Sequence, residues 1–130
     1  MITTNLSIDV PDLDQGLGFY RDVFDFKEVS RPFPGLVVLK AGNLSLCLLE
    51  KKAGSKASQN TDDTRRYSRH WTPVHIDFHV DDLHSVLDKA TSAGAICEAL
   101  HENPGHGSVA FCSDPFGHGF CLIEHVKKNP

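Results

Sequence analysis

The sequence lacks the features that mark membrane and secreted proteins. No apolar run approaches the roughly 20 residues that a membrane-spanning helix needs. Residues 1–7 contain neither the basic segment nor the apolar segment of a signal peptide. We therefore expect a cytoplasmic protein that has no membrane partner.

Positive charge is also scarce. The chain of 130 residues has 13 lysines and arginines against 17 aspartates and glutamates, which gives a formal net charge of -4. Proteins that bind nucleic acids usually carry a basic surface that contacts the phosphates, so nucleic acid is not an expected partner. One basic cluster, made of Arg65, Arg66, Arg69 and His70, lies in a polar stretch and is interpreted as a solvated loop.

Closely spaced cysteine pairs are absent, and this excludes several metal and redox motifs. The four cysteines, Cys47, Cys97, Cys112 and Cys121, form no C-x-x-C pair. Zinc fingers and thioredoxin-like centres normally need such closely spaced cysteines. Because no secretory signal is visible, we expect reduced thiols.

What is present is a repeat at an offset of 70 residues. Residues 5–10 (NLSIDV) and 75–80 (HIDFHV) both alternate polar and apolar side chains, which predicts a strand with one apolar face in each half. A helix follows each strand, with Asp12 as a candidate N-cap of the first and Gly94 as the stop of the second. Short strands separated by turn residues follow at 26–30, 36–40 and 44–50 in the first half, and at 95–100, 108–113 and 119–126 in the second.

Each half is thus predicted to be a βαβββ module, and the predicted fold class is α+β. Module one covers about residues 1–50 and module two about residues 73–130, and the polar residues 51–72 form a linker or flexible loop between them. Each module alone would bury too little apolar surface to be stable. We therefore expect one domain in which the modules pack together or against a second chain.

Three motifs give this repeat a family resemblance. Residues 19–22 (FYRD), 75–83 (HIDFHVDDL) and 114–118 (DPFGH) follow in this order, and together with the two modules they resemble the vicinal oxygen chelate superfamily. That superfamily includes glyoxalase I, bleomycin and fosfomycin resistance proteins and ring-cleaving dioxygenases. The resemblance implies a glyoxalase-like fold in which the sheets curl into a groove, and a homodimer as the assembly. Because one fold hosts many functions, the function has to be argued from the site.

The alternation places particular side chains in this groove. Because Leu6, Ile8 and Val10 are expected to face the helix, their neighbours along the strand face the groove. The same rule, applied to the first and last strand of each module, gives the expected ligand-binding residues Asn5, Ser7, Ser45, Cys47, Leu49, His75, Asp77, Cys121 and Ile123. Leu49 and Ile123 would form an apolar wall of the groove, and the polar residues of this set would orient a ligand.

The resemblance also implies four metal-ligand positions, which usually hold His, Glu, His and Glu. In this sequence they fall on Asn5, Cys47, His75 and Cys121, so only His75 keeps the usual residue. A Ni²⁺, Mg²⁺ or Mn²⁺ site would lack its carboxylate oxygens, and we favour no metal cofactor. The alternative is a zinc site formed by Cys47, His75 and Cys121, whereas the simpler interpretation of both cysteines is as small apolar residues.

These positions favour a protein that binds a small organic molecule without the usual divalent metal, as bleomycin resistance proteins do, and the resemblance suggests antibiotic resistance as a role. One alternative is a metal-dependent lyase, transferase or dioxygenase with an altered site. Another is a metal-independent enzyme in which His75 or His79 is the general base, oriented by Asp77 or Asp9. Asp9, Asp77 and His79 also have a structural interpretation, in which they form hydrogen-bonded pairs across neighbouring strands, His79 with a carboxylate.

Overall fold

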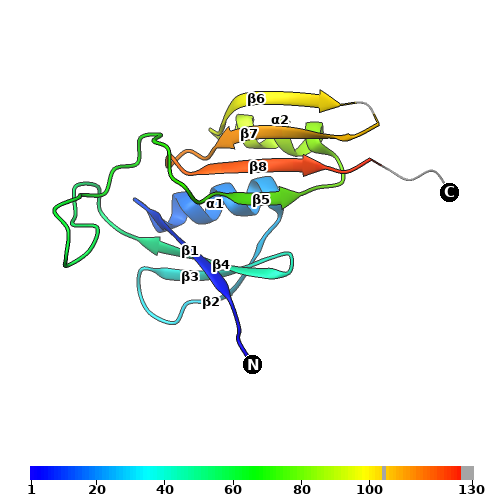
Figure 1. The fold of residues 1–130 in the computed structure, drawn as a ribbon. Helices are drawn as coiled ribbons and strands as arrows, with labels where there is room; N and C mark the ends of the chain where they lie inside the picture. Colours follow the sequence, from blue (N-terminus) through cyan, green and yellow to red (C-terminus); the bar gives the residue numbers. More distant parts are fainter. Residues whose placement is uncertain (104, 127–130) are drawn as a thin grey trace. The chain divides into compact units, whose positions relative to one another are not determined.

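Two βαβββ modules follow one another along the chain (Figure 1). The computed structural model describes residues 1–103 and 105–126, and the chain divides into unit 1, Met1–Tyr67, and unit 2, Ser68–Pro130. Unit 1 contains β1 (Asn5–Val10), α1 (Leu13–Phe24), β2 (Lys27–Ser30), β3 (Leu36–Ala41) and β4 (Leu44–Glu50). Unit 2 contains β5 (Ile76–His79), α2 (Leu83–Ser92), β6 (Ile96–Asn103), β7 (Gly107–Ser113) and β8 (Gly119–Glu124). The α+β fold and the repeated module are those that the sequence predicts.

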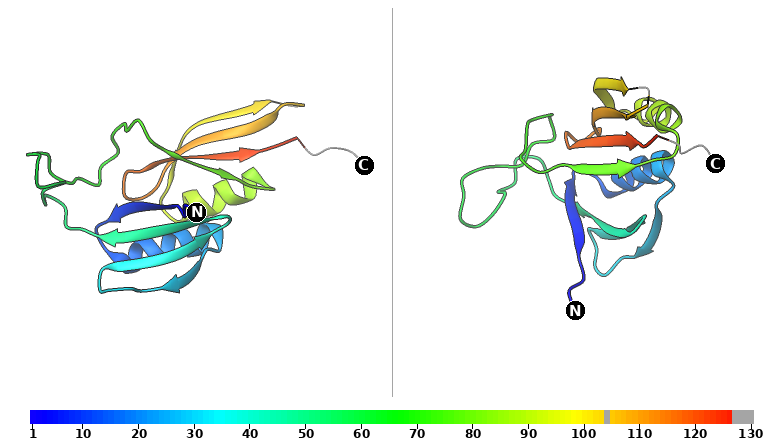
Figure 2. Two further views of the ribbon diagram at one scale, coloured as in Figure 1. Left: turned by 60° about the horizontal axis from the view of Figure 1, so that its bottom comes forward. Right: turned by 45° about the vertical axis from the view of Figure 1, so that its right-hand side comes forward.

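Each module forms one mixed sheet of four strands. The strand order is β1-β4-β3-β2 in unit 1 and β5-β8-β7-β6 in unit 2, and Figure 2 shows both sheets from two further directions. The first strand pairs in parallel with the last, β1 with β4 and β5 with β8, whereas the other neighbours are antiparallel. The first and last strands of a module therefore lie side by side, although the whole module separates them in the sequence.

A helix covers one face of each sheet. α1 packs on β1, β3 and β4, and α2 packs on β6, β7 and β8. The buried core of unit 1 includes Val10, Leu13, Phe19, Tyr20, Val23, Val37, Leu39, Leu46 and Leu48. That of unit 2 includes Leu83, Leu87, Ala90, Ala110, Cys112, Phe120 and Leu122. We refer to the opposite face of a sheet, which the module's own helix does not cover, as its distal face.

Both helices begin at an aspartate that caps the first turn. The Oδ1 atom of Asp12 accepts a hydrogen bond from the Gln15 amide at 2.9 Å, which confirms the N-cap expected from the sequence. Asp82 does the same for the Ser85 amide at 3.1 Å. These bonds satisfy amide groups that have no partner within the helix.

A second carboxylate ties each helix start to the last strand of its sheet. The Leu13 amide donates to Glu50 Oε2 at 2.8 Å, and the Leu83 amide donates to Glu124 Oε1 at 3.0 Å. Negative charge is favourable at a helix N-terminus. Because Glu50 and Glu124 end β4 and β8, each bond fixes the helix to the strand that carries part of the candidate site.

Some boundaries differ from the sequence prediction. Strand β6 extends to Asn103 rather than residue 100, and β8 ends at Glu124 rather than residue 126. The expected second module runs to residue 130, and residues 127–130 lie outside the described part of the chain. Among the described residues, no helix is long and apolar enough to cross a bilayer.

Helix α1 approaches its sheet closely at one glycine. A Cβ atom at Gly16 would lie 3.0 Å from Val10 Cγ1 and 3.3 Å from Leu48 Cδ1, and both of those side chains are fully buried. Gly18 lies in the same helix, but a Cβ there would be 3.9 Å from Arg21 Nη2, its nearest neighbour. The packing therefore requires a glycine at position 16 and not at position 18.

Exchanging each glycine for alanine tests this packing. Gly18→Ala should raise the free energy of unfolding by about 1 kcal/mol, because alanine has the higher helix propensity. Gly16→Ala should lower it by about 1 kcal/mol, since overpacking costs roughly 1–3 kcal/mol and exceeds the gain in propensity. Urea denaturation measures both, and equal stabilisation by the two substitutions would contradict the close approach.

Candidate functional site

A row of side chains crosses the distal face of the unit 2 sheet. Asp77 on β5 lies beside Cys121 on β8, Cys121 lies beside Phe111 on β7, and Phe111 lies beside Ala99 on β6. Successive side chains of a strand point to opposite faces. Because Phe120, next to Cys121 in the chain, is buried in the core under the helix, this row lies on the distal face.

His75 lies at one end of this row and contacts Asp77. Its Nε2 atom is 3.0 Å from Asp77 Oδ1, and the two side chains are 52% and 44% exposed. A carboxylate bonded to one ring nitrogen fixes the tautomer of the imidazole, and the other nitrogen is then able to accept a proton. The pair can therefore orient a polar group of a ligand or take part in proton transfer.

Cys121 completes a cluster of three potential metal ligands. One ligand atom from each of His75, Asp77 and Cys121 lies within 4.8 Å of the other two. Burial, followed by the charge of Asp77, raises the pKa of the Cys121 thiol to about 11. Cys121 is therefore a neutral thiol at physiological pH, and a metal ion would have to displace its proton.

An arginine from the segment before β5 also lies on this face. Arg69 Nε donates to Glu98 Oε2 at 2.8 Å, and Arg69 Nη2 donates to Oε1 at 3.2 Å. These hydrogen bonds lower the pKa of Glu98 and raise that of Arg69. A Cβ atom at Gly119 would lie 2.9 Å from Arg69 Nη2, so the guanidinium rests directly on the backbone of β8, two residues before Cys121.

A second row lies next to the first on the same face. It runs from His79 through Ile123 and Val109 to His101. The His101 ring meets the Phe111 ring edge-on, with 5.7 Å between their centroids. The distal face of unit 2 therefore combines an aromatic and aliphatic surface with the polar pair of His75 and Asp77.

The distal face of unit 1 carries neutral polar groups at the corresponding positions. Asn5 lies beside Ser45, and Ser7 lies beside Cys47, across the parallel pair of β1 and β4. The Asn5 amide Nδ2 donates to Ser7 Oγ at 3.3 Å and to Cys47 Sγ at 3.5 Å. The expected ligand-binding residues thus form one set on each sheet: Asn5, Ser7, Ser45, Cys47 and Leu49 in unit 1, and His75, Asp77, Cys121 and Ile123 in unit 2.

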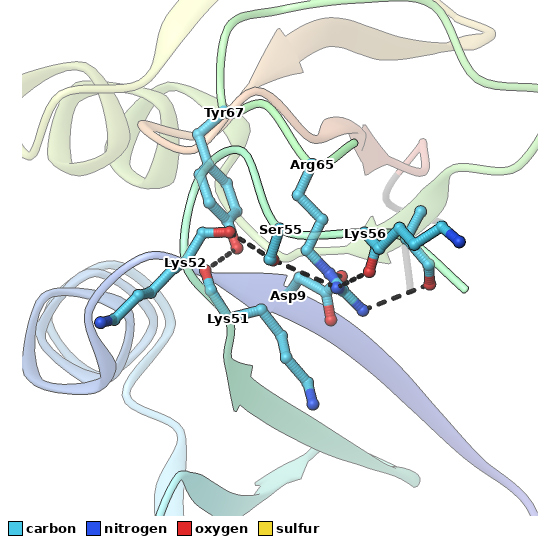
Figure 3. Close-up of polar contacts among 8 residues, drawn as sticks. Asp9, Lys51, Lys52, Ser55, Lys56, Arg65 and Tyr67 are labelled. Carbon is cyan, nitrogen blue, oxygen red and sulfur yellow. Dashed lines mark hydrogen bonds and ion pairs between the residues drawn. The ribbon is translucent and has the colours of Figure 1, made fainter. Parts of the chain in front are cut away.

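The loop that follows β4 is attached to the distal face of unit 1 (Figure 3). Arg65 Nε donates to Asp9 Oδ2 at 2.8 Å, and Arg65 Nη1 donates to the carbonyl oxygen of Lys56. The Tyr67 hydroxyl donates to the carbonyl oxygen of Lys51. The Arg65 side chain is only 19% exposed, so Asp9 serves to hold this loop on β1.

The family follows from a comparison of the sequence with known domains. A family model described as a glyoxalase-like domain matches residues 5–123. The chain belongs to the glyoxalase-like family. None of the curated proteins matches its sequence. Family and fold together place this glyoxalase-like domain in the vicinal oxygen chelate superfamily.

Solved structures share the fold of this glyoxalase-like domain at low sequence identity. Lactoylglutathione lyase from Agrobacterium tumefaciens is 24% identical, with a TM-score of 0.63, and the match covers 95% of this chain and 92% of that chain. The fosfomycin resistance protein FosX from Listeria monocytogenes is 17% identical, with a TM-score of 0.72 and coverage of 97% and 96%. A glyoxalase/bleomycin resistance protein/dioxygenase family enzyme from Burkholderia phytofirmans PsJN is 20% identical, with a TM-score of 0.68 and coverage of 94% and 97%. At these identities the similarity shows the fold alone.

The glutamates at the ends of the last strands do not occupy the ligand positions that the resemblance implies. Glu50 and Glu124 bind the helix N-termini and so lie on the helix side of their sheets. The side chains three residues earlier, Cys47 and Cys121, lie on the distal faces. The distal positions on the last strands of this glyoxalase-like domain therefore offer thiols and no carboxylate.

One sequence interpretation holds only in part, and another is wrong. The basic cluster does lie in a loop in which Arg66 and Arg69 are exposed, but Arg65 is half-buried and bound to Asp9, and Glu98 binds Arg69. Among the described residues, His79 pairs with no carboxylate: its Nδ1 atom is 2.8 Å from His125 Nε2, and the planes of the two rings are nearly parallel. Asp9 also forms a structural pair, but its partner is Arg65 of the loop and not a residue on a neighbouring strand.

Sequence reasoning missed three residues on the distal face of unit 2. Alternation along β7 would have placed Phe111 there, because its neighbour Cys112 is buried in the core. No local signal identifies Arg69 and Glu98, which are 29 residues apart in the chain.

Replacement of Arg65 tests the attachment of the loop. Arg65→Ala should lower the local stability of the loop by about 1–3 kcal/mol, because it removes hydrogen bonds from a charged donor. Hydrogen exchange at the Ala57 amide, which donates to the Asp63 carbonyl within this loop, should become correspondingly faster. Arg66→Ala is the matched control, since Arg66 is exposed, and unchanged exchange in Arg65→Ala would contradict the account.

Proposed function

We propose that this glyoxalase-like domain binds a small organic molecule on the distal face of the unit 2 sheet. The molecule would carry an aromatic ring, which packs on Phe111, and a hydroxyl or amine group, which hydrogen-bonds to His75 and Asp77. The observation that supports the proposal is the continuous row of Asp77, Cys121 and Phe111, with His75 at its end.

The apolar part of this surface is suited to a flat ligand. The Phe111 side chain is 42% exposed, although it stands on an inner strand of the sheet. Ile123 and Val109 lie in the neighbouring row, and the rings of His101 and Phe111 pack against each other in a T-shaped arrangement. Small-molecule sites are largely apolar and contain a few well-placed polar groups, which is the composition of this face.

The polar part sets the proposed hydrogen bonding. Asp77 can accept a hydrogen bond from a ligand hydroxyl or amine, and His75 can accept or donate according to its tautomer. Arg69 is bound to Glu98, so its positive charge is largely compensated. The face therefore favours a neutral or cationic ligand over a strongly anionic one.

A zinc-dependent activity is the second candidate, favoured by the cluster of His75, Asp77 and Cys121. Nitrogen, oxygen and sulfur donors fit Zn²⁺, whereas Mg²⁺ and Mn²⁺ prefer sites made of oxygen. The FosX variant from Listeria monocytogenes whose structure contains Mn(II) is 18% identical to this chain, with a TM-score of 0.69. A zinc ion bound here would supply a Lewis acid. Asp77 and His75 would then coordinate the metal and would not hydrogen-bond to an organic molecule.

Titration calorimetry with a panel of phenols and aromatic amines tests the first candidate. Phe111→Ala should weaken the binding of a panel compound about twofold to tenfold, because aromatic pairs contribute roughly 0.5–1.5 kcal/mol beyond area burial. Phe33→Ala is the matched control, since Phe33 is an exposed phenylalanine of unit 1. If the panel gives no binding, or if Phe111→Ala binds as well as the parent, the proposal fails.

The same titrations, made with a chelator and with added zinc, separate the two candidates. The organic-ligand proposal predicts that binding persists in the chelator. The zinc candidate predicts one equivalent of tightly bound zinc, and its loss in Cys121→Ser but not in Cys97→Ser.

A further inference from the structure

Two cysteines face each other on neighbouring strands of unit 2. Cys97 on β6 and Cys112 on β7 are direct partners in the antiparallel register. Facing Cα atoms in such a pair are about 4.5–5.5 Å apart, within the range of about 4.4–6.8 Å that a disulfide spans. Both residues are free thiols in the structure.

The two sulfurs lie on the same side of the sheet. Cys112 is buried, and its register partner on β8 is the core residue Phe120. A β-bulge follows Cys97 directly, so that Glu98 and Ala99 together face Phe111 on the distal face. Cys97 stays on the core side of this bulge and is the more accessible thiol of the pair.

The neighbouring Cys97 thiol also affects the pKa of Cys112. Burial, followed by the charge and the hydrogen bond of Cys97, raises the pKa of Cys112 to about 12. Cys121 contributes less to this shift, and the register places it opposite Phe111 rather than Cys112. Cys97 is therefore the thiol that Cys112 can reach.

We propose that Cys97 and Cys112 are a reversible redox pair, which a low-molecular-weight disulfide such as oxidised glutathione closes into an intramolecular disulfide. The Cys97 thiolate attacks one sulfur of the oxidant, breaks its disulfide bond and releases one thiol. The Cys112 thiol then loses its proton as it attacks the Cys97 sulfur of the mixed disulfide, and the second thiol, which takes up a proton, is released. Two protein thiols are oxidised, one oxidant disulfide is reduced to two thiols, and the protons of the cysteines end on these products.

The position of the pair connects it to the distal face. Glu98 directly follows Cys97 and binds Arg69, which rests on Gly119. A disulfide between Cys97 and Cys112 would tie β6 to β7 at the bulge that carries Glu98. Oxidation would thus restrain the segment of β6 that carries Glu98, the partner of Arg69 in the ion pair.

The experiment treats the folded protein with oxidised glutathione, traps the remaining thiols with iodoacetamide and maps the digested peptides by mass spectrometry. The expected result is the loss of two of the four free thiols, a cross-linked peptide pair that contains Cys97 and Cys112, and full recovery of both thiols with dithiothreitol. Because the pair is internal, its formation should not depend on protein concentration.

Single variants make the assignment specific. Cys97→Ser should abolish the cross-link and leave Cys112 reduced, and circular dichroism checks that this variant is folded. Cys47→Ser is the matched control and should form the cross-link like the parent. A stable mixed disulfide at Cys97 that never closes, or a cross-link of Cys112 to Cys121, would overturn the proposal.

Discussion

The hydrogen bond between each helix start and the last glutamate of its sheet determines which way the candidate site residues point. Glu124 binds the Leu83 amide and Glu50 binds the Leu13 amide, so both glutamates lie on the helix side. Side chains alternate along a strand. Because the glutamates point to the helix side, Cys121 and Cys47, three residues earlier, point to the distal faces. The parallel partner strands then bring Asp77 beside Cys121 and Ser7 beside Cys47.

The two modules share this architecture but differ in the chemistry of their distal faces. In unit 1, Asn5 donates to Ser7 and Cys47, and this set contains no imidazole or carboxylate. In unit 2, the corresponding set is His75, Asp77 and Cys121, next to an exposed phenylalanine. At these corresponding positions the same backbone thus presents neutral polar side chains in one copy and titratable side chains beside an exposed aromatic ring in the other. Our functional proposal rests on this difference.

The sequence allowed the fold and part of the site to be predicted because both depend on local periodicity. Alternation in residues 75–80 placed His75 and Asp77 on one face, and the repeat at an offset of 70 identified the two modules. The cluster of those two residues with Cys121 required the parallel register of β5 and β8, which the structure supplies. The chain contains eight histidines, and only His75 belongs to a cluster of three potential ligands among the described residues.

Contacts made by loops and bulges were beyond sequence reasoning. Arg65 and Arg69 are similar residues in one polar stretch, but one binds a carboxylate on β1 and the other binds a carboxylate at the bulge in β6. The sequence separations of 56 and 29 residues leave no periodic signal for these pairs. Simple alternation from Cys97 would place Glu98 on the distal face and Ala99 on the helix side, but the bulge makes both residues face Phe111.

The most direct test of the central claim is a nuclear magnetic resonance titration of the isotope-labelled protein with the tightest-binding aromatic amine or phenol. Ring-current shifts should concentrate on the amides and methyl groups of Ala99, Val109, Cys121 and Ile123, which surround Phe111 on the distal face of unit 2. Shifts confined to unit 1, or to the helix side of the unit 2 sheet around Leu83 and Leu87, would contradict the account.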